Sequence, residues 1–160
     1  MNDASHSPHD LLPGLGLPAD TEAGVRRWID DPHYASERAA LGDLLAEVAA
    51  GSDAARAELL DAFSQVLPIG TGGRRGRVGP GPNRMNSVVV RETAQGVVDA
   101  LLAAGDTPQV AIVYDTRMHS RQFAYAIAEQ CAAGGLTVIL IDAPRPTPEL
   151  SFLVRRMGCG

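Results

Sequence analysis

Two short apolar runs separated by an amphipathic segment constrain the fold of this chain more than any other feature. Residues 109–114 (QVAIVY) and 136–141 (LTVILI) have the length and β-branched content of buried strands. Between them, residues 121–135 carry apolar side chains at helical spacing, including Phe123 and Ile127, and end in two glycines. A strand, a helix and a strand at this spacing predict a right-handed βαβ unit and therefore a parallel sheet.

Helical patterns flank this unit on both sides. Residues 88–104 show helical apolar spacing, although the three valines that open the segment leave its start ambiguous with a strand. After the second strand, Thr147 is a suitable N-cap, Pro148 fits the first helical position and Gly158 follows the last turn. Together these patterns predict a three-layer α/β/α domain.

The N-terminal third of the chain has a different character. Residues 1–20 are rich in proline, glycine, serine and histidine without periodicity, which predicts a flexible lead-in. Residues 21–66 contain three amphipathic patterns, the first ended by Pro32, and are predicted to form a helical N-terminal segment. Residues 67–160 then form the α/β domain. Because the α/β pattern stops on a helix with no strand to follow it, we expect this domain to be incomplete.

Composition favours a globular protein in a reducing compartment. Hydrophobic residues make up 45% of the chain, and no apolar run approaches the roughly 20 residues of a membrane-spanning helix. The N-terminus lacks the basic and apolar regions of a secretory signal, so we expect a cytoplasmic protein that does not bind membranes. Cys131 and Cys159 are too few and too isolated for a metal site or a disulfide framework.

Charge is unevenly distributed along the chain. Residues 1–61 carry twelve acids and four arginines, whereas residues 62–160 carry seven acids and ten arginines. An anionic ligand is therefore expected to bind the second part. All fourteen basic side chains are arginine, which excludes a Schiff-base lysine and the lysine of a P-loop.

Residues 70–86 (GTGGRRGRVGPGPNRMN) contain six glycines and four arginines. Glycine allows backbone N–H groups to approach a ligand, and arginine matches phosphate oxygens, so the segment predicts a phosphate site. It lacks the P-loop pattern, and Arg75 stands where a dinucleotide fingerprint needs its third glycine. The alternative is a glycine-rich hairpin with solvated arginines.

Four motifs in order, GTGGRRG, GPNRMN, YDTR and PRPTPELSF, resemble the start of the α-D-phosphohexomutase superfamily, which contains the phosphoglucomutases and phosphomannomutases. The second and fourth are similar to the bacterial phosphoglucomutase-like branch. The resemblance implies an isomerase of carbohydrate metabolism with four domains around a cleft. An enzyme phosphoserine would exchange its phosphate with a hexose 1- or 6-phosphate through a sugar bisphosphate, supported by Mg²⁺ on aspartates of the second domain.

The resemblance also implies the roles of particular residues. Thr71, Gly72 and Arg75 match the first active-site loop, where an arginine beside the phosphoserine would neutralise charge on the phosphoryl group. Arg84 lies in the continuation of that loop and would position it. Arg117 matches the arginine that follows the first strand, where ligands gather in α/β sheets. All five are candidates for the phosphate and substrate cleft. Departures from the family pattern include Arg74, which replaces an apolar residue and is expected to face out of the loop.

The family's phosphoserine motif, TASHNP, does not occur in these 160 residues. The resemblance places it after Gly160, together with the magnesium ligands, the sugar-specificity loop and the remaining mutase domains. We therefore expect no catalytic residue and no metal site in this chain, and no activity from the chain alone. His119 could be proposed as a general base, but histidines are common in loops.

Two other functions remain open from the sequence. The chain could be a free-standing module that binds phosphosugars or regulates a partner without catalysis. Nucleic-acid binding through the arginines is disfavoured by the net charge of −5 and by the 4% aromatic content. The sequence leaves open whether the sugar is glucose, mannose or a pentose, and it leaves the oligomeric state open.

Overall fold

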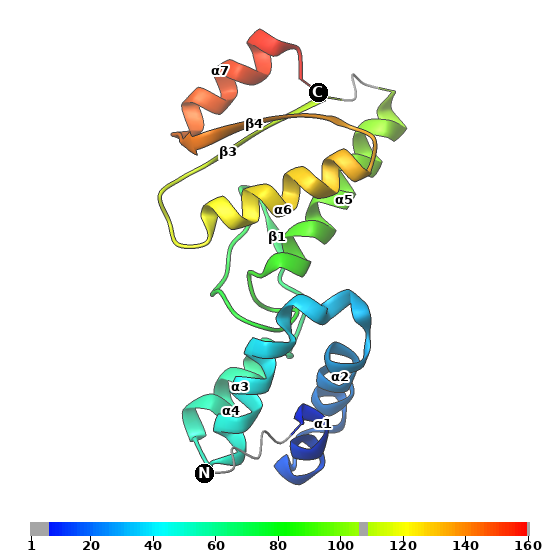
Figure 1. Ribbon diagram of the computed structural model, residues 1–160, viewed down its shortest axis with the longest axis vertical. Coiled ribbons are helices and arrows are strands. Elements are labelled where there is room, and N and C mark those ends of the chain that lie inside the picture. The colour runs from blue at the N-terminus through cyan, green and yellow to red at the C-terminus, as the bar shows by residue number, and fades with distance from the viewer. Residues whose placement is uncertain (1–6, 106–108, 160) are drawn as a thin grey trace. The chain divides into compact units, whose positions relative to one another are not determined.

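The computed structural model describes residues 7–105 and 109–159 and divides the chain into two compact units (Figure 1). The first unit ends at Val89 and the second begins at Val90. Helix α5, Ser87–Ala104, contains this boundary. Each unit has an apolar core of its own, so each is described by itself.

The first unit is a helical bundle followed by the glycine-rich loop. Apolar side chains of the helices form one core, in which the ring of Trp28 stacks on Tyr34 at 4.5 Å and meets the edge of Phe63 at 5.7 Å between centroids. Helices occupy most of the segment for which the sequence predicts them. In chain order they are α1 (Pro8–Leu11), the 3-10 helix η1 (Leu12–Leu15), α2 (Ala19–Asp30), the 3-10 helix η2 (Pro32–Glu37), α3 (Arg38–Ala49) and α4 (Asp53–Ala62).

Local signals in the sequence explain two of the helix ends. Helix α2 stops before Pro32, and Asp31 has an extended backbone with ψ of 124°. Helix α4 begins after Ser52, whose hydroxyl accepts a hydrogen bond from the backbone N–H of Ala55 at 3.2 Å. These two local features determine where α2 ends and where α4 begins.

Within the segment predicted to be a flexible lead-in, residues 8–15 form α1 and η1. The side chain of Leu12 is fully buried in the bundle core. The guanidinium of Arg56 donates to the backbone oxygens of Leu15 at 2.6 Å and Gly16 at 2.8 Å. A buried leucine and two charge-assisted hydrogen bonds outweigh the weak helix propensity of this segment. Residues 1–6 lie outside the described residues.

The second unit contains the predicted βαβ arrangement. Strand β3 (Gln109–Tyr114) pairs in parallel with β4 (Thr137–Pro144), and α6 (Ser120–Ala133) connects them. Helix α7 (Thr147–Met157) and α6 lie on opposite faces of the two strands (Figure 1). Residues of α5 beyond the boundary pack with α6 through Val98 and Cys131. The domain is therefore a three-layer α/β/α arrangement.

The two strands are less buried than the sequence predicts. Within β3 only Ile112 and Tyr114 are buried, and no residue of β4 is. In the part of the chain that the structure describes, this sheet has two strands, so each strand has an open edge. Helix α7 buries none of its side chains, and Phe152 and Met157 stay exposed on it.

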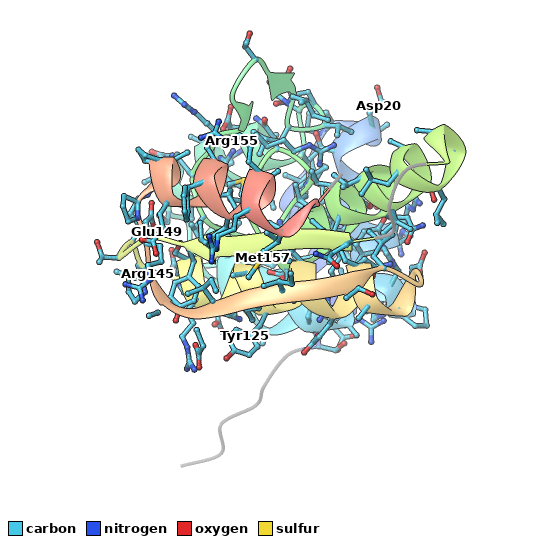
Figure 2. All side chains as sticks on the ribbon, turned by 90° about the horizontal axis from the view of Figure 1, so that it is seen from above. Asp20, Tyr125, Arg145, Glu149, Arg155 and Met157 are labelled. Carbon is cyan, nitrogen blue, oxygen red and sulfur yellow. The ribbon has the colours of Figure 1, made fainter. Side chains whose placement is uncertain are left out.

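The start of α7 also differs from the prediction. Pro146, not Thr147, is the N-cap residue, and no side chain caps this end. Arg145 instead forms an ion pair with Glu149 at 3.4 Å across the first turn, near the α7 ribbon in Figure 2. The helix ends as predicted, with Gly158 in the left-handed region at φ 66°.

Gly134, at the end of α6, is expected to be intolerant of a side chain. A Cβ atom there would lie 2.6 Å from a methyl of Val98, which is 1% exposed and cannot move aside. Gly134→Ala should therefore lower the free energy of unfolding of the second unit by about 1–3 kcal/mol. Chemical denaturation followed by far-UV circular dichroism would measure the change.

The matched control is Gly96→Ala in the exposed part of α5, where an added Cβ atom would have nothing within 4 Å. Alanine is the better helix former, so this variant should be about 0.5–1 kcal/mol more stable than the unmodified chain. If both variants shift stability in the same direction, the contact between α6 and α5 is not as tight as the structure has it.

Candidate functional site

The start of the glycine-rich loop forms a short exposed hairpin in the first unit. Strands β1 (Ile69–Gly70) and β2 (Gly73–Arg74) pair antiparallel, with Ile69 opposite Arg74. Thr71 and Gly72 occupy the turn, and both are exposed. Exposed backbone N–H groups in a turn can bind an anion when they point to one side.

Arg75 folds its guanidinium back over this turn. A Cβ atom at Gly72 would lie 3.1 Å from Nη2 of Arg75, so the positive charge sits beside the exposed backbone of the turn. No ion pair joins Arg75 to any residue that the structure describes. The structure thus brings Thr71, Gly72 and Arg75 together at one exposed turn, with a guanidinium of the kind that binds anions.

The expectation that Arg74 faces out of the loop is wrong. Its side chain is partly buried, and Nη1 donates to the backbone oxygen of Val89 at 3.5 Å. A long arginine side chain can bury its apolar stem while its guanidinium reaches a backbone oxygen, and the sequence expectation did not allow for this.

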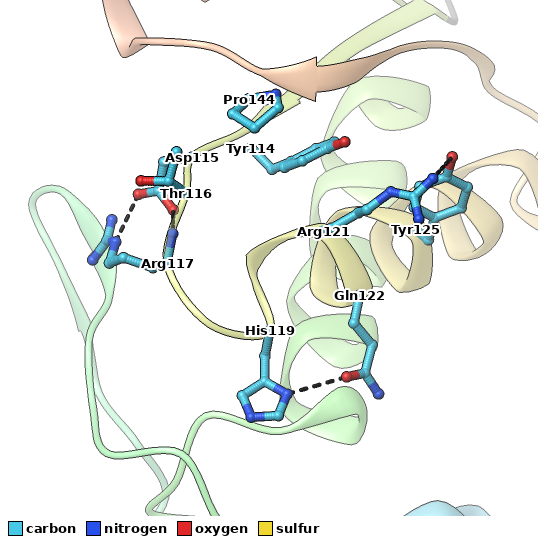
Figure 3. A pocket seen from close by; sticks show the side chains of 9 residues that line it. All are labelled: Tyr114, Asp115, Thr116, Arg117, His119, Arg121, Gln122, Tyr125 and Pro144. Carbon is cyan, nitrogen blue, oxygen red and sulfur yellow. Dashed lines mark hydrogen bonds and ion pairs between the residues drawn. The ribbon is translucent and has the colours of Figure 1, made fainter.

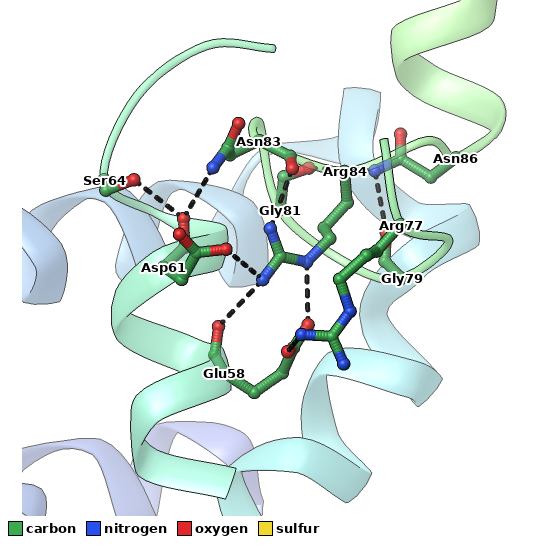
Figure 4. A network of polar contacts seen from close by, with 9 residues as sticks. All are labelled: Glu58, Asp61, Ser64, Arg77, Gly79, Gly81, Asn83, Arg84 and Asn86. Atoms are coloured by element: carbon green, nitrogen blue, oxygen red, sulfur yellow. Dashed lines mark hydrogen bonds and ion pairs between the residues drawn. The ribbon is translucent and has the colours of Figure 1, made fainter. Parts of the chain in front are cut away.

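Arg84 has a position unlike that of the other loop candidates. Its side chain is 2% exposed, and its guanidinium forms ion pairs with Glu58 at 2.7 Å and Asp61 at 2.6 Å (Figure 4). Burial lowers the pKa of Arg84, but the hydrogen bonds and charges of the two carboxylates outweigh it and the pKa is raised. With both carboxylates attached, Arg84 has no free face for a phosphate in this conformation.

In the second unit, the end of β3 opens into a shallow depression of about 800 Å³ (Figure 3). The backbone turns there through His119, which has a left-handed φ of 65°, before α6 begins. The ring of His119 contacts the side chain of Gln122 at 3.2 Å, and no carboxylate among the described residues is bonded to it to orient it as a base. The lining residues are Tyr114, Asp115, Thr116, Arg117, His119, Arg121, Gln122, Tyr125 and Pro144.

Arg117 lies at the edge of this depression and is paired within its own turn. Its Nε donates to Asp115 Oδ2 at 2.6 Å and its backbone N–H donates to Oδ1 at 3.0 Å. Hydrogen bonds from Ser120 and from Arg117 hold the pKa of Asp115 below its ordinary value. The Arg117 side chain is 88% exposed, so an anion can reach its outer face while Asp115 orients it.

A second cluster at the same end of the sheet was not anticipated from the sequence. Asp142 on β4 accepts hydrogen bonds from the Tyr114 hydroxyl at 2.9 Å and from both Nε and Nη2 of Arg121 at 3.1 Å. The Arg121 guanidinium also lies over the ring of Tyr125 at 5.1 Å. The signal was available, since Asp142 follows the second apolar run as Asp115 follows the first.

This cluster predicts an acid-sensitive second unit. Hydrogen bonds from Tyr114, with Tyr125 and Arg121, lower the pKa of Asp142. A depressed folded-state pKa contributes stability that is present above the unfolded value of about 3.9 and is lost as the pH falls below it. Asp142→Asn should reduce the loss of stability between pH 6 and pH 3, measured by urea unfolding on amide NMR signals of the second unit.

Tyr114→Phe should also reduce that loss, because it removes the hydroxyl that contributes most to the lowered pKa of Asp142. Burial and the hydrogen bond to Asp142 raise the pKa of the Tyr114 hydroxyl itself, so it remains a donor across this range. An unchanged acid dependence in both variants would exclude the cluster as its source.

The described residues contain no group of three or more histidine, cysteine, aspartate or glutamate side chains that could hold a metal ion. Both cysteines, Cys131 and Cys159, are free thiols. Over the same described ranges, each helix is too short or too polar to cross a membrane.

Comparison with known proteins gives these residues a context. Residues 67–160 match the family model described as phosphoglucomutase/phosphomannomutase, alpha/beta/alpha domain I. The phosphoglucomutase of Staphylococcus saprophyticus is 41% identical over 95 residues, which cover 59% of this chain and 17% of that protein. The phosphoglucomutase of Staphylococcus aureus (strain bovine RF122) is 40% identical over 101 residues, covering 63% and 18% respectively.

This chain therefore spans less than a fifth of the length of these relatives. No solved structure matches the chain significantly. The matched segment contains both the hairpin that carries Arg75 and the strand end that carries Arg117. Because the family model for domain I matches more than half of the chain, the chain belongs to the phosphoglucomutase/phosphomannomutase family.

Proposed function

We propose that this chain supplies part of the active site of a phosphosugar mutase, which moves a phosphoryl group between two positions of a hexose phosphate. The observation that carries the proposal is the exposed hairpin at Thr71 and Gly72, with the guanidinium of Arg75 beside it and without an ion pair to any described residue. It lies within the segment that matches the family. An isomerase of this family, acting in carbohydrate metabolism, needs such an anion site next to its phosphoserine.

In the proposed reaction, Arg75 stabilises the phosphoryl group during transfer. The phosphoryl group carries negative charge on its three peripheral oxygens, and a guanidinium already held in place lowers the cost of that charge. Backbone N–H groups of the Thr71–Gly72 turn would contribute in the same way. Arg117 is proposed to bind a phosphate or hydroxyl of the sugar through its exposed outer face.

The resemblance supports three finer proposals. The phosphoserine would lie in the rest of the first domain and the Mg²⁺ ligands in the second domain, in both cases on residues outside this chain. The substrate would be a hexose 1- or 6-phosphate. The enzyme would act in the cytoplasm, which is in keeping with two free thiols and with a phosphorylated substrate.

The proposal is tested by an assay of glucose 1-phosphate conversion to glucose 6-phosphate, with glucose 1,6-bisphosphate as activator. The enzyme that contains this chain should turn over, and the purified 160-residue chain should not exceed a buffer control. Turnover by the chain alone would refute the assignment of the phosphoserine to another segment. Inactivity of the whole enzyme on a panel of hexose and pentose phosphates would refute the mutase assignment.

A further inference from the structure

The helical segment before residue 67 lies outside the family match, yet its last helix contacts the glycine-rich loop directly. Helix α4 presents Glu58 and Asp61 three residues apart, on one face. Both carboxylates reach the guanidinium of Arg84, which is 26 residues further along the chain than Glu58. The contact therefore joins the helical bundle to the continuation of the loop (Figure 4).

The guanidinium of Arg84 is bonded on every side. Nε donates to Glu58 Oε1 at 2.7 Å, Nη2 lies 2.6 Å from Asp61 Oδ2, and Nη1 donates to the backbone oxygen of Asn83 at 2.8 Å. Arg84 is the largest fully buried side chain in the described part of the chain. A buried charge is tolerated only with such partners, so loss of either carboxylate would leave the guanidinium charge less well compensated.

Glu58 connects two points of the loop at once. Its Oε1 accepts from Arg84, and its Oε2 lies 2.6 Å from Nη1 of Arg77. Arg77 follows Arg75 by two residues. The backbone N–H of Met85 donates to the oxygen of Arg77 at 2.8 Å, which closes the loop between these two contacts.

Backbone contacts hold the same segment against the end of α4. The backbone N–H of Asn83 donates to the oxygen of Ala62 at 3.0 Å, and the side-chain amide of Asn83 donates to the oxygen of Asp61 at 3.0 Å. Gly81 has φ of 115°, and a Cβ atom there would lie 2.8 Å from the oxygen of Ala62. Only glycine allows this approach.

We propose that Glu58, Asp61 and Arg84 are positioning residues that hold the loop so that Arg75 is presented to the transferring phosphoryl group. This inference rests on the proposed function for the role of Arg75. In this proposal the three residues act through the loop and not through contact with the substrate. The helical segment would thus hold the catalytic loop in place, although it lies outside the domain that matches the family.

The contacts predict an order of effects. Glu58→Gln weakens the attachment of both Arg77 and Arg84, whereas Asp61→Asn weakens only that of Arg84. Arg77→Gln removes only the ion pair with Glu58. Because the Arg77 side chain is 75% exposed, this substitution should not unfold the bundle. Loosening of the loop should therefore be largest in Glu58→Gln and smaller in the other two variants.

The first part of the test measures hydrogen exchange and does not require enzymatic activity. In Glu58→Gln, NMR hydrogen exchange of the Asn83 and Met85 amides should rise about tenfold, as expected when a charge-assisted hydrogen bond is lost. The amide of Asp31, bonded to the oxygen of Arg27 in α2, should be unchanged. Fluorescence of Trp28, the single tryptophan, reports whether the bundle stays folded.

The second arm uses the whole enzyme. Glu58→Gln should lower kcat about tenfold and leave KM within about twofold, because the charge of Arg75 is needed most in the transition state. The matched control is Glu22→Gln, which breaks the exposed pair of Glu22 and Arg26 on α2 and should change neither constant.

Each outcome decides the inference. Unchanged exchange of the two loop amides in Glu58→Gln overturns it, and so does a rise in KM with constant kcat. If Glu58→Gln unfolds the bundle, Arg77→Gln decides instead, and it must raise loop exchange without altering Trp28 fluorescence. An inactive unmodified enzyme would refute the proposed function, while the exchange arm would still determine whether the attachment holds the loop.

Discussion

Replacing Arg75 with alanine in the enzyme that contains this chain is expected to lower turnover by about a hundredfold or more. Loss of a charged donor that stabilises a transferring phosphoryl group costs on the order of 3 kcal/mol. The Arg75 side chain is exposed and carries no ion pair within the described residues, so its removal should not destabilise the fold. Steady-state kinetics with glucose 1-phosphate, and thermal melting of the same preparation, would measure both effects.

Two arginine variants provide the comparison. Arg26→Ala removes the same charge from the exposed surface of α2 and should leave kcat/KM unchanged. Arg74→Ala removes a partly buried side chain that contacts Val89, so it should lower stability more than Arg75→Ala does and affect turnover less. Equal losses of turnover in Arg74→Ala and Arg75→Ala would show that the wrong arginine has been assigned to the phosphoryl group.

The central elements of the fold could be predicted because local and tertiary signals agree in them. The apolar runs that become β3 and β4, and the amphipathic segment that becomes α6, each have one period that fits one structure. The same reasoning places Arg117 and Asp115 at the carboxyl end of a strand, where the structure has them.

Burial was predicted less well, since it depends on partners that a local pattern does not contain. The strands were expected to be buried on the strength of their β-branched residues, but no residue of β4 is buried in the two-stranded sheet. Leu12 shows the converse, because a short segment without periodicity supplies a fully buried side chain to the bundle core.

Arg84 shows why site residues are the hardest to assign from sequence. In the sequence it is one of four arginines in a glycine-rich loop, and only the family resemblance distinguishes its expected role from that of Arg75. The difference comes from Glu58 and Asp61 on a helix that the loop must fold against. Two acidic residues three positions apart before a basic loop can indicate a contact with that loop. Most such acidic pairs are solvated, however, so the pattern alone does not predict the contact.

Truncating Leu59 to alanine is expected to have the largest effect on the stability of the first unit. Leu59 is fully buried in the bundle core and lies on α4 between Glu58 and Asp61. Loss of its side chain should lower the free energy of unfolding by about 2–5 kcal/mol, through lost burial and the cavity left behind. Urea denaturation followed by the fluorescence of Trp28, which packs in the same core, would measure it.

Val66→Ala is the control, because Val66 is 62% exposed and its truncation should change stability by less than about 0.5 kcal/mol.

Leu59→Ala also separates two ways in which α4 can affect the loop. Leu59→Ala keeps both carboxylates and therefore the ion pairs of Arg84. Under strongly native conditions the amides of Asn83 and Met85 in this variant should exchange only through unfolding of the whole first unit. Glu58→Gln should open them locally, well before the unit unfolds. If the two variants speed exchange by the same local route, apolar packing and not the ion pairs of Arg84 holds the loop in place.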